Sequence, residues 1–187
     1  MTNVVSERAR SGLDHFLAQA TKNALVATGE SCPVTPIDDA SATEREVVMF
    51  TVSSYTFRIL LFIHFESNAA TRAHFGRLAD KSVDEMAGER FLDAMMERGN
   101  LLCGALNREL ALFFPHIGMS TPCILHRSAV EHIGAVTPAF TRRYRAQVSA
   151  DLALRLTIAV CAFADLDFPF DHRAVDETKA ASELEIF

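Results

Sequence analysis

The sequence lacks the features that indicate a membrane or a nucleic acid as partner. Its 187 residues contain no uncharged apolar run approaching the roughly 18 residues of a membrane span. The net charge of −6 and the pI near 5.6 oppose binding to nucleic acid or anionic lipid, because both require a positive field. The first residues show no basic flank followed by an apolar block, so we expect a soluble, cytoplasmic protein.

Motifs of nucleotide-binding and hydrolytic enzymes are also missing. The chain contains neither the Gly-rich fingerprint of a dinucleotide-binding fold nor the Gly-Lys-Ser/Thr sequence of a P-loop. The segment from Gly118 to Pro122 begins like the nucleophile elbow of a serine hydrolase, but it ends in proline instead of glycine. No strand is predicted before it. A serine hydrolase is therefore not expected.

Cysteine is scarce and scattered. Because Cys32, Cys103, Cys123 and Cys161 lie far apart, and three of them lie in apolar runs, we predict free buried thiols and no disulfides. Cys123 and His126 suggest half of a metal site, but residues three apart on a strand face opposite sides. No second half is present in the sequence. We therefore expect no metal or other cofactor of the chain's own.

What the chain does have is the material for one domain with a large core, since 49% of its residues are apolar and 14 are Phe. The order of helical and strand patterns predicts an α+β fold, mainly an antiparallel sheet with long helices packed on one face. We expect a single domain over residues 1–187, with a mobile loop near 30–45 and a frayed tail after about 171. The expected helices span residues 6–28, 67–79 and 82–114, and the expected strands span residues 46–53, 55–65, 122–128, 141–149 and 152–163.

The central feature is the expected helix over 82–114. Its apolar residues recur at three- and four-residue spacing and predict one buried face. Ser82 and Glu85 form a capping-box pattern at its start, and Pro115 ends it. A neighbouring stripe is polar and places a carboxylate and a carboxamide one turn apart, facing solvent. This stripe consists of Asp93, Glu97, Asn100, Gly104 and Asn107.

The segment from Phe91 to Gly104, followed by Ser120-Thr-Pro122, resembles the signature of the CheC/CheX/FliY family of chemotaxis phosphatases. That signature is Asp or Ser, three residues, Glu, two residues, Asn, a spacer of about 22 residues and Pro. Asp93, Glu97, Asn100 and Pro122 occupy these positions here, with a spacer of 21 residues. The order of elements also fits over roughly residues 5 to 170, and the chain is most similar to the single-site, CheX-like members.

The resemblance implies a phosphatase acting on the aspartyl phosphate of a CheY-like response-regulator receiver domain. In this interpretation Asn100 positions the attacking water, and Glu97 pairs with a lysine of the receiver and docks the helix. Gly104 lets the partner's backbone come close, and Asp93 and Asn107 complete the partner-binding stripe. The required Mg²⁺ is expected to be held by the receiver.

Other interpretations remain open. The same fold could serve as a receiver-binding or flagellar-switch adaptor without turnover, and a ligand-sensing domain would also fit the apolar composition. A loose match places Ala20 and Asn23 of the first helix where Glu and Asn of a second site would fall. Because the anchoring carboxylate is absent there, we interpret the first helix as structural, with a vestigial second site as the alternative.

The strand patterns lead to two further expectations. Arg58 and His64 interrupt the strand over 55–65 and are expected to point away from the core. The apolar strand over 152–163 carries little charge at its edge, so we expect it to be covered by pairing with a second copy. In the resembling family, single-site members can form such dimers. We therefore predict a homodimer whose two Glu97/Asn100 helices face outward.

Overall fold

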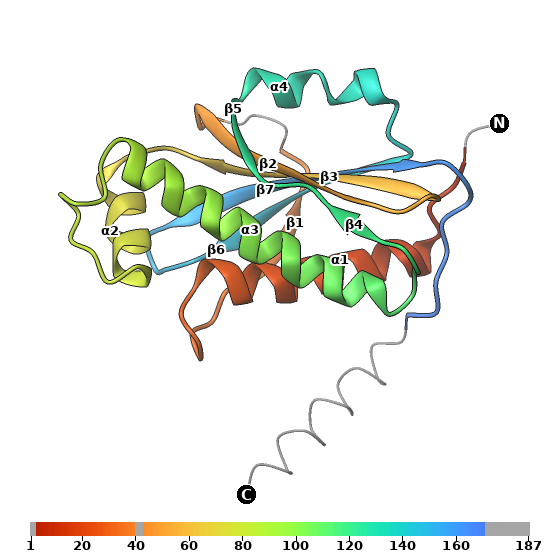
Figure 1. Ribbon diagram of the computed structural model, residues 1–187, viewed down its shortest axis with the longest axis horizontal. Helices are drawn as coiled ribbons and strands as arrows, with labels where there is room; N and C mark the ends of the chain where they lie inside the picture. The colour runs from red at the N-terminus through yellow and green to blue at the C-terminus, as the bar shows by residue number, and fades with distance from the viewer. Residues whose placement is uncertain (1–2, 40–42, 171–187) are drawn as a thin grey trace, which may run out of the picture.

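Seven strands of the described chain form one antiparallel sheet in the order β1-β6-β7-β3-β2-β4, with β5 also paired to β2. The computed structural model describes residues 3–39 and 43–170. Figure 1 shows the sheet with two long helices on one side and a short helical segment on the other. The strands are β1 (Val34–Ile37), β2 (Glu46–Ser53), β3 (Phe57–Phe65), β4 (Gly118–Met119), β5 (Cys123–His126), β6 (Phe140–Gln147) and β7 (Ala153–Ala162).

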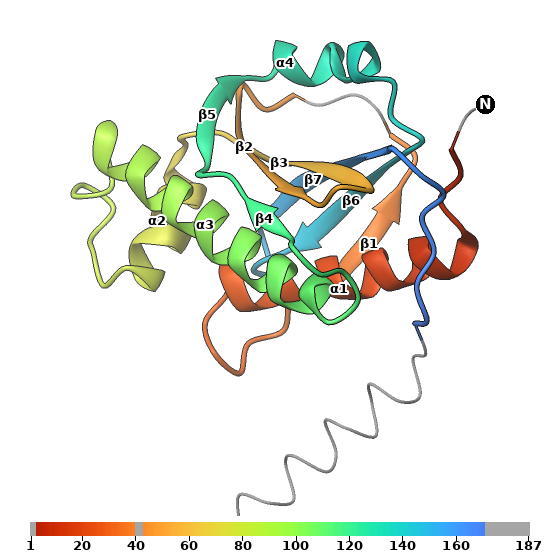
Figure 2. The ribbon, with the colours of Figure 1, turned by 45° about the vertical axis from the view of Figure 1, so that its right-hand side comes forward.

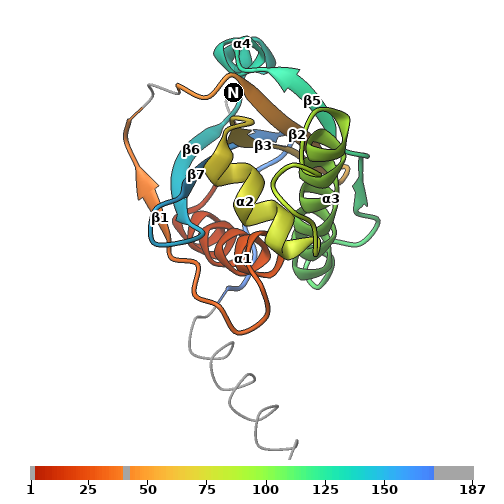
Figure 3. The same ribbon diagram turned by 90° about the vertical axis from the view of Figure 1, so that its left-hand side faces the viewer.

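The long helices α1 (Glu7–Leu25) and α3 (Glu89–Ala111) lie side by side on one face of the sheet (Figure 3). They run antiparallel, because Phe16 near the middle of α1 stacks on Phe113 just after α3, at 5.8 Å between ring centroids, whereas Arg98 of α3 reaches the α1 C-terminus. The shorter α2 (Ala69–Leu78) lies beyond one end of the pair. The predicted α+β fold with long helices on one face is confirmed.

The core fills the space between this helix pair and the sheet. Strand alternation turns every second side chain toward the helices, and on β3 and β7 these side chains are almost completely buried. The periodicity of the two long helices predicted their buried faces well, since helical spacing directs side chains three and four apart to the same side. The buried set on α3 includes Phe91, Met95, Gly99, Leu102, Cys103, Ala105, Leu106 and Leu110.

Part of the second face of the sheet is covered as well. Figure 1 shows α4 (Ser128–Glu131) on the side opposite α1 and α3, followed in the chain by the 3₁₀ turn η1 (Ile133–Val136). Arg58 points to this face and is exposed, as expected. His64 also leaves the main core but is only 1% exposed, and its Nε2 lies 2.9 Å from Thr157 Oγ1. His64 therefore points away from the main core, as expected, but its side chain is buried on the second face instead of exposed.

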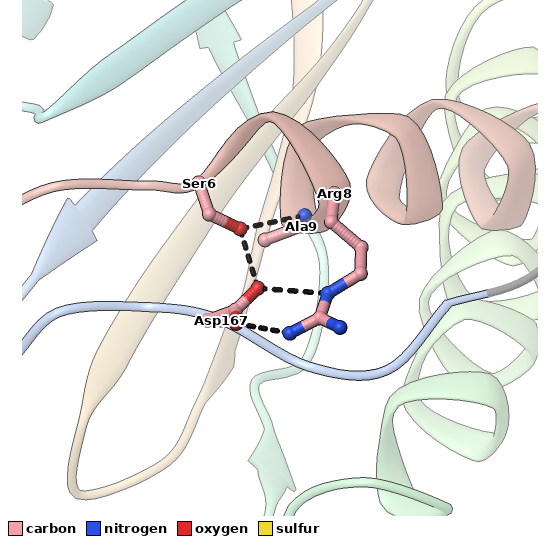
Figure 4. Close-up of polar contacts among 4 residues, drawn as sticks. All are labelled: Ser6, Arg8, Ala9 and Asp167. Atoms are coloured by element: carbon pink, nitrogen blue, oxygen red, sulfur yellow. Dashed lines mark hydrogen bonds and ion pairs between the residues drawn. The ribbon is translucent and has the colours of Figure 1, made fainter.

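Residues 163–170 fasten the start of α1 to the end of β7. Asp167 accepts hydrogen bonds from Ser6 Oγ at 2.5 Å and from Arg8 Nε at 3.2 Å, and Arg8 Nη2 completes the ion pair (Figure 4). Ser6 also caps α1 by accepting from the Ala9 N–H at 3.0 Å. These contacts, with the hydrogen bonds from Arg8 foremost, lower the pKa of the Asp167 carboxyl. The fastening carries Phe168 into the aromatic cluster beside the two long helices.

The start of the central helix differs from the prediction. Ser82 and Glu85 do exchange the hydrogen bonds of a capping box, but they cap a separate turn that ends before Gly88. Gly88 adopts φ of +57°, which a right-handed helix cannot continue through, and α3 begins at Glu89. The polar stripe lies entirely within the helix that remains.

The expected loop near 30–45 was wrong over Val34–Ile37. These residues form the edge strand β1, paired with β6 although Pro36 lies within it. A short proline-containing strand is tolerated at a sheet edge and gives almost no signal in a single sequence. Residues 40–42 of the expected loop, and the expected tail from 171 onward, lie outside the described residues.

The remaining boundaries shift by one to three residues, and one position in the sheet was mispredicted. The first helix ends at Leu25, α2 begins at Ala69 after the Asn68 cap, and β4 was not predicted. Strand β7, expected at an edge, lies between β6 and β3 in the interior of the sheet. The reason given for a homodimer is therefore wrong, because both edges of β7 are already paired within the chain.

Candidate docking site on α3

The polar stripe of α3 faces away from the core. Asp93, Glu97 and Asn100 are exposed, whereas Gly104 and Asn107 are half-buried. Residues three and four apart on a helix are neighbours, so Glu97 and Asn100 present a carboxylate and a carboxamide side by side. This arrangement offers solvent a charged acceptor beside a group that both donates and accepts hydrogen bonds.

The opposite face of α3 is held tightly against the sheet. A β-carbon built at Gly99 would come within 2.6 Å of Val48 Cγ1 on β2 and 3.4 Å of Pro122 Cβ. One turn later, Cys103 Sγ lies 3.9 Å from the Thr51 carbonyl oxygen and 4.0 Å from that of Ser120. The connection that carries Pro122 thus packs beside α3, where Figure 2 shows β4 and β5.

Burial excludes Cys103 as a nucleophile. Its side chain is inaccessible, and loss of hydration raises the pKa of the thiol to about 11. Among residues 3–39 and 43–170, no group of histidine, cysteine and carboxylate side chains is arranged to hold a metal ion. All four cysteines are free, as predicted, although Cys123 is exposed rather than buried. The reactive capacity of the α3 face therefore rests on its carboxylates and amides.

Arg98 connects α3 to the ends of α1 and α2. The Arg98 guanidinium, directly after Glu97, lies 3.4 Å from both the Ala24 and the Leu78 carbonyl oxygens. These oxygens belong to the last turns of α1 and α2, whose C-terminal carbonyls lack helical partners. Arg98 thereby ties three helices together beneath the exposed stripe.

The two ends of the stripe differ in their surroundings. Asp93 lines a shallow hollow of about 490 Å³ with Arg90 and with residues of the connection between α2 and α3. Toward the other end, the Arg108 side chain folds back so that its Nη1 lies 3.7 Å from the position of a β-carbon on Gly104. Asn107 Oδ1 is buried and has no hydrogen-bond partner among the described residues.

The sequence analysis did not single out Arg108, although it lies four residues, or one helical turn, after Gly104. It lines a second hollow of about 520 Å³ together with Lys22 and Asn23 of α1. Asn23 is exposed, but Ala20 is buried at the position one turn earlier, where a paired carboxylate would stand. The exposed part of α1 thus supplies an amide and a cation but lacks the acid–amide pair of α3.

Leu101 is a second residue of this surface that the sequence analysis did not single out. Its side chain is 43% exposed, next to Asn100 in sequence and toward the α1 side of the stripe. An exposed leucine beside charged residues is common on surfaces and by itself indicates no function. Here it adds apolar area to a face that is otherwise polar.

No protein-family model and no curated protein matches the sequence. Solved structures, in contrast, match its fold over most of their length. A chain of the CheX-CheY-BeF3-Mg complex from Borrelia burgdorferi is 10% identical, with a TM-score of 0.59 and coverage of 81% of this chain and 96% of that chain. A chemotactic CheC-like protein from Shewanella oneidensis is 13% identical, with a TM-score of 0.59 and coverage of 81% and 99%. FliY of Thermotoga maritima is 12% identical, with a TM-score of 0.54 and coverage of 85% and 92%.

These likenesses establish the fold. The identities of 10–13% are low, yet matching structures include CheX, CheC-like and FliY proteins. The fold expected from the sequence resemblance is therefore confirmed as that of CheC, CheX and FliY. None of the described helices combines the length and the apolar character of a membrane span.

Proposed function

We propose that this chain, which has the CheC/CheX/FliY fold, is a member of that family and removes the phosphoryl group from the aspartyl phosphate of a receiver domain. The observation that carries the proposal is the exposed Glu97/Asn100 pair, one turn apart on the outward face of α3. A CheY-like partner is supported by the structural match to a chain of a CheX-CheY complex.

Hydrolysis of the aspartyl phosphate requires few chemical groups from the phosphatase itself. A phosphorylated receiver already carries the phosphoryl group and its Mg²⁺, so the remaining task is to place a water in line with phosphorus. Phosphoryl transfer depends mainly on positioning and charge stabilisation. The Asn100 carboxamide has an acceptor oxygen and a donor nitrogen, and it can orient such a water without titrating near neutral pH.

Glu97 has the complementary role of docking. Its carboxylate pairs with a lysine of the receiver and sets the register of α3 against the phosphorylation site. Gly104, one turn beyond Asn100, has no side chain of its own to keep the partner's backbone away. Asp93 and Asn107 extend the contact surface at either end of the stripe.

The direct test is loss of label from phosphorylated receivers of the same genome, with and without the protein. We expect the wild type to accelerate the loss and Asn100→Ala to abolish the acceleration while keeping the same circular dichroism spectrum. Gln19→Ala on α1 is the matched control, because it removes a half-buried helical carboxamide that lies outside both the α3 stripe and the hollow around Arg108. Full activity of Asn100→Ala would refute the site assignment.

A receiver-binding adaptor of the same fold is the second outcome of this test. It predicts that a receiver binds the wild type but that its phosphoryl group is lost at the unassisted rate. Binding without acceleration would therefore replace the phosphatase proposal by the adaptor. The exposed Glu97 serves docking in either case, whereas Asn100 is required only for turnover.

A further inference from the structure

The stripe on α3 is electrically asymmetric. Its first half carries the carboxylates of Asp93 and Glu97, whereas its far end carries the folded-back guanidinium of Arg108 over Gly104. Gly104 follows Glu97 by seven positions, which is roughly 10 Å along the helix axis. The exposed face thus presents carboxylates toward one end and a cation toward the other.

The cationic end is reinforced from a second helix. Lys22 of α1 lines the same hollow of about 520 Å³ as Arg108, and none of the described residues that line it is acidic. Within residues 3–39 and 43–170, neither Lys22 nor Arg108 has an ion-pair partner. Two like charges are thus brought together in a protein whose net charge is −6. An acidic group from outside would neutralise both.

We infer that Arg108, supported by Lys22, binds a carboxylate on the surface of the docked receiver domain, as a second charged contact besides Glu97. This inference rests on the proposed docking of a receiver on α3. The Glu97 pair supplies one charged contact, and its attraction alone does not distinguish the two directions in which a partner could lie along the helix. Two contacts of opposite sign allow only one direction, because the reversed complex would bring like charges together. Arg108 is therefore a positioning residue and not a catalytic one.

Both cations also lie in the last turns of their helices, where a positive charge stabilises the helix dipole. A purely structural role would affect stability but not the affinity for a receiver. The test must therefore measure binding separately from both folding and turnover.

The experiment titrates labelled receivers, held in the beryllofluoride and Mg²⁺ form, with the full chain. Arg108→Glu is expected to raise the Kd at least about tenfold at low salt, and this difference should shrink near 0.5 M salt, where surface charges are screened. Arg108→Lys should keep most of the affinity. Arg145→Glu on the opposite face of the sheet makes the same charge change at an exposed site and should shift the Kd no more than about twofold.

Each result of this binding experiment supports or overturns the inference about Arg108. An Arg108→Glu variant that folds and binds like Arg145→Glu would overturn the inference, even if the wild type dephosphorylates the receiver. Weakened binding of Arg108→Glu to a receiver that the wild type binds but does not dephosphorylate would support the inference and refute the phosphatase. If Arg108→Glu does not fold, Lys22→Glu takes its place with the same expected direction. A wild type that binds no receiver would refute both proposals.

Discussion

Gly99 of α3 lies so close to Val48 of β2 that a β-carbon at position 99 would approach Val48 Cγ1 to 2.6 Å. The β-branched valine has no flexible end that could move aside, so helix and strand would have to separate. We predict that Gly99→Ala lowers the free energy of unfolding by about 1–2 kcal/mol, with overpacking outweighing the gain in helix propensity. Denaturant unfolding measures this change.

The same substitution five residues later should have the opposite effect on stability. At Gly104 the nearest atom to a new β-carbon is Arg108 Nη1, at an ordinary contact distance of 3.7 Å. Gly104→Ala should therefore stabilise the free protein by up to about 1 kcal/mol. If a receiver's backbone approaches at Gly104, affinity for the receiver should fall despite this gain. Unchanged affinity would remove Gly104 from the docking stripe.

Glu97 offers a test of docking that is separate from catalysis. Glu97→Ala should weaken receiver binding by on the order of 2 kcal/mol if its charge pair is buried in the complex, and Glu97→Lys should be worse. The measured quantity is the Kd for a receiver, together with the dephosphorylation rate at saturation. Asp84→Ala, an exposed acid before α3, is the control. Equal affinities for the Glu97 and Asp84 variants would contradict the docking role.

The buried His64 predicts a loss of stability in mild acid. Burial lowers the pKa of His64 to about 4 in the folded protein, with Glu44 raising it and Arg155 and Arg143 lowering it further. The unfolded chain, at about 6.5, binds this proton first, so the free energy of unfolding should fall as the pH drops from about 6.5 to about 4. The contribution amounts to roughly 3 kcal/mol as an upper value.

His64→Gln provides the comparison for this pH dependence, because its amide can still reach the Thr157 hydroxyl. Urea unfolding at several pH values should show a shallower decline for the variant than for the wild type. His74, whose pKa is also lowered mainly by burial, remains in both proteins and cancels in the difference. Parallel stability curves would show that His64 does not titrate as its burial predicts.

The homodimer remains a prediction, but a different edge of the sheet would have to form its interface. Since β7 is internal, pairing across a two-fold axis would have to use β1 or the β4 and β5 side of the sheet. Strand β1 is short and contains Pro36, both of which disfavour pairing with another chain. Light scattering at micromolar concentration should give twice 20.6 kDa for the dimer. A mass of 20.6 kDa would end this prediction.

The sequence alone was sufficient to predict those helices and strands whose formation depends on their own residues. The apolar spacing around Leu13 and Leu106 marked the buried faces of both long helices, and the β-branched and aromatic composition of β2 predicted Glu46–Ser53 to the residue. The same helical spacing put Glu97 and Asn100 on an exposed stripe, because the core-facing residues of one helix determine where its remaining residues point. The fold class then followed from the order of these elements.

Only the tertiary structure decided which surfaces meet. It put β7 in the interior of the sheet, paired the proline-containing β1 with β6, and buried His64 on the same face of β3 as the exposed Arg58. It also brought Lys22 and Arg108 to one hollow, although they are 86 positions apart in the sequence. Periodicity describes a residue's direction relative to its own helix or strand. Contacts between distant segments depend on how those elements pack, which a single sequence does not encode in any local pattern.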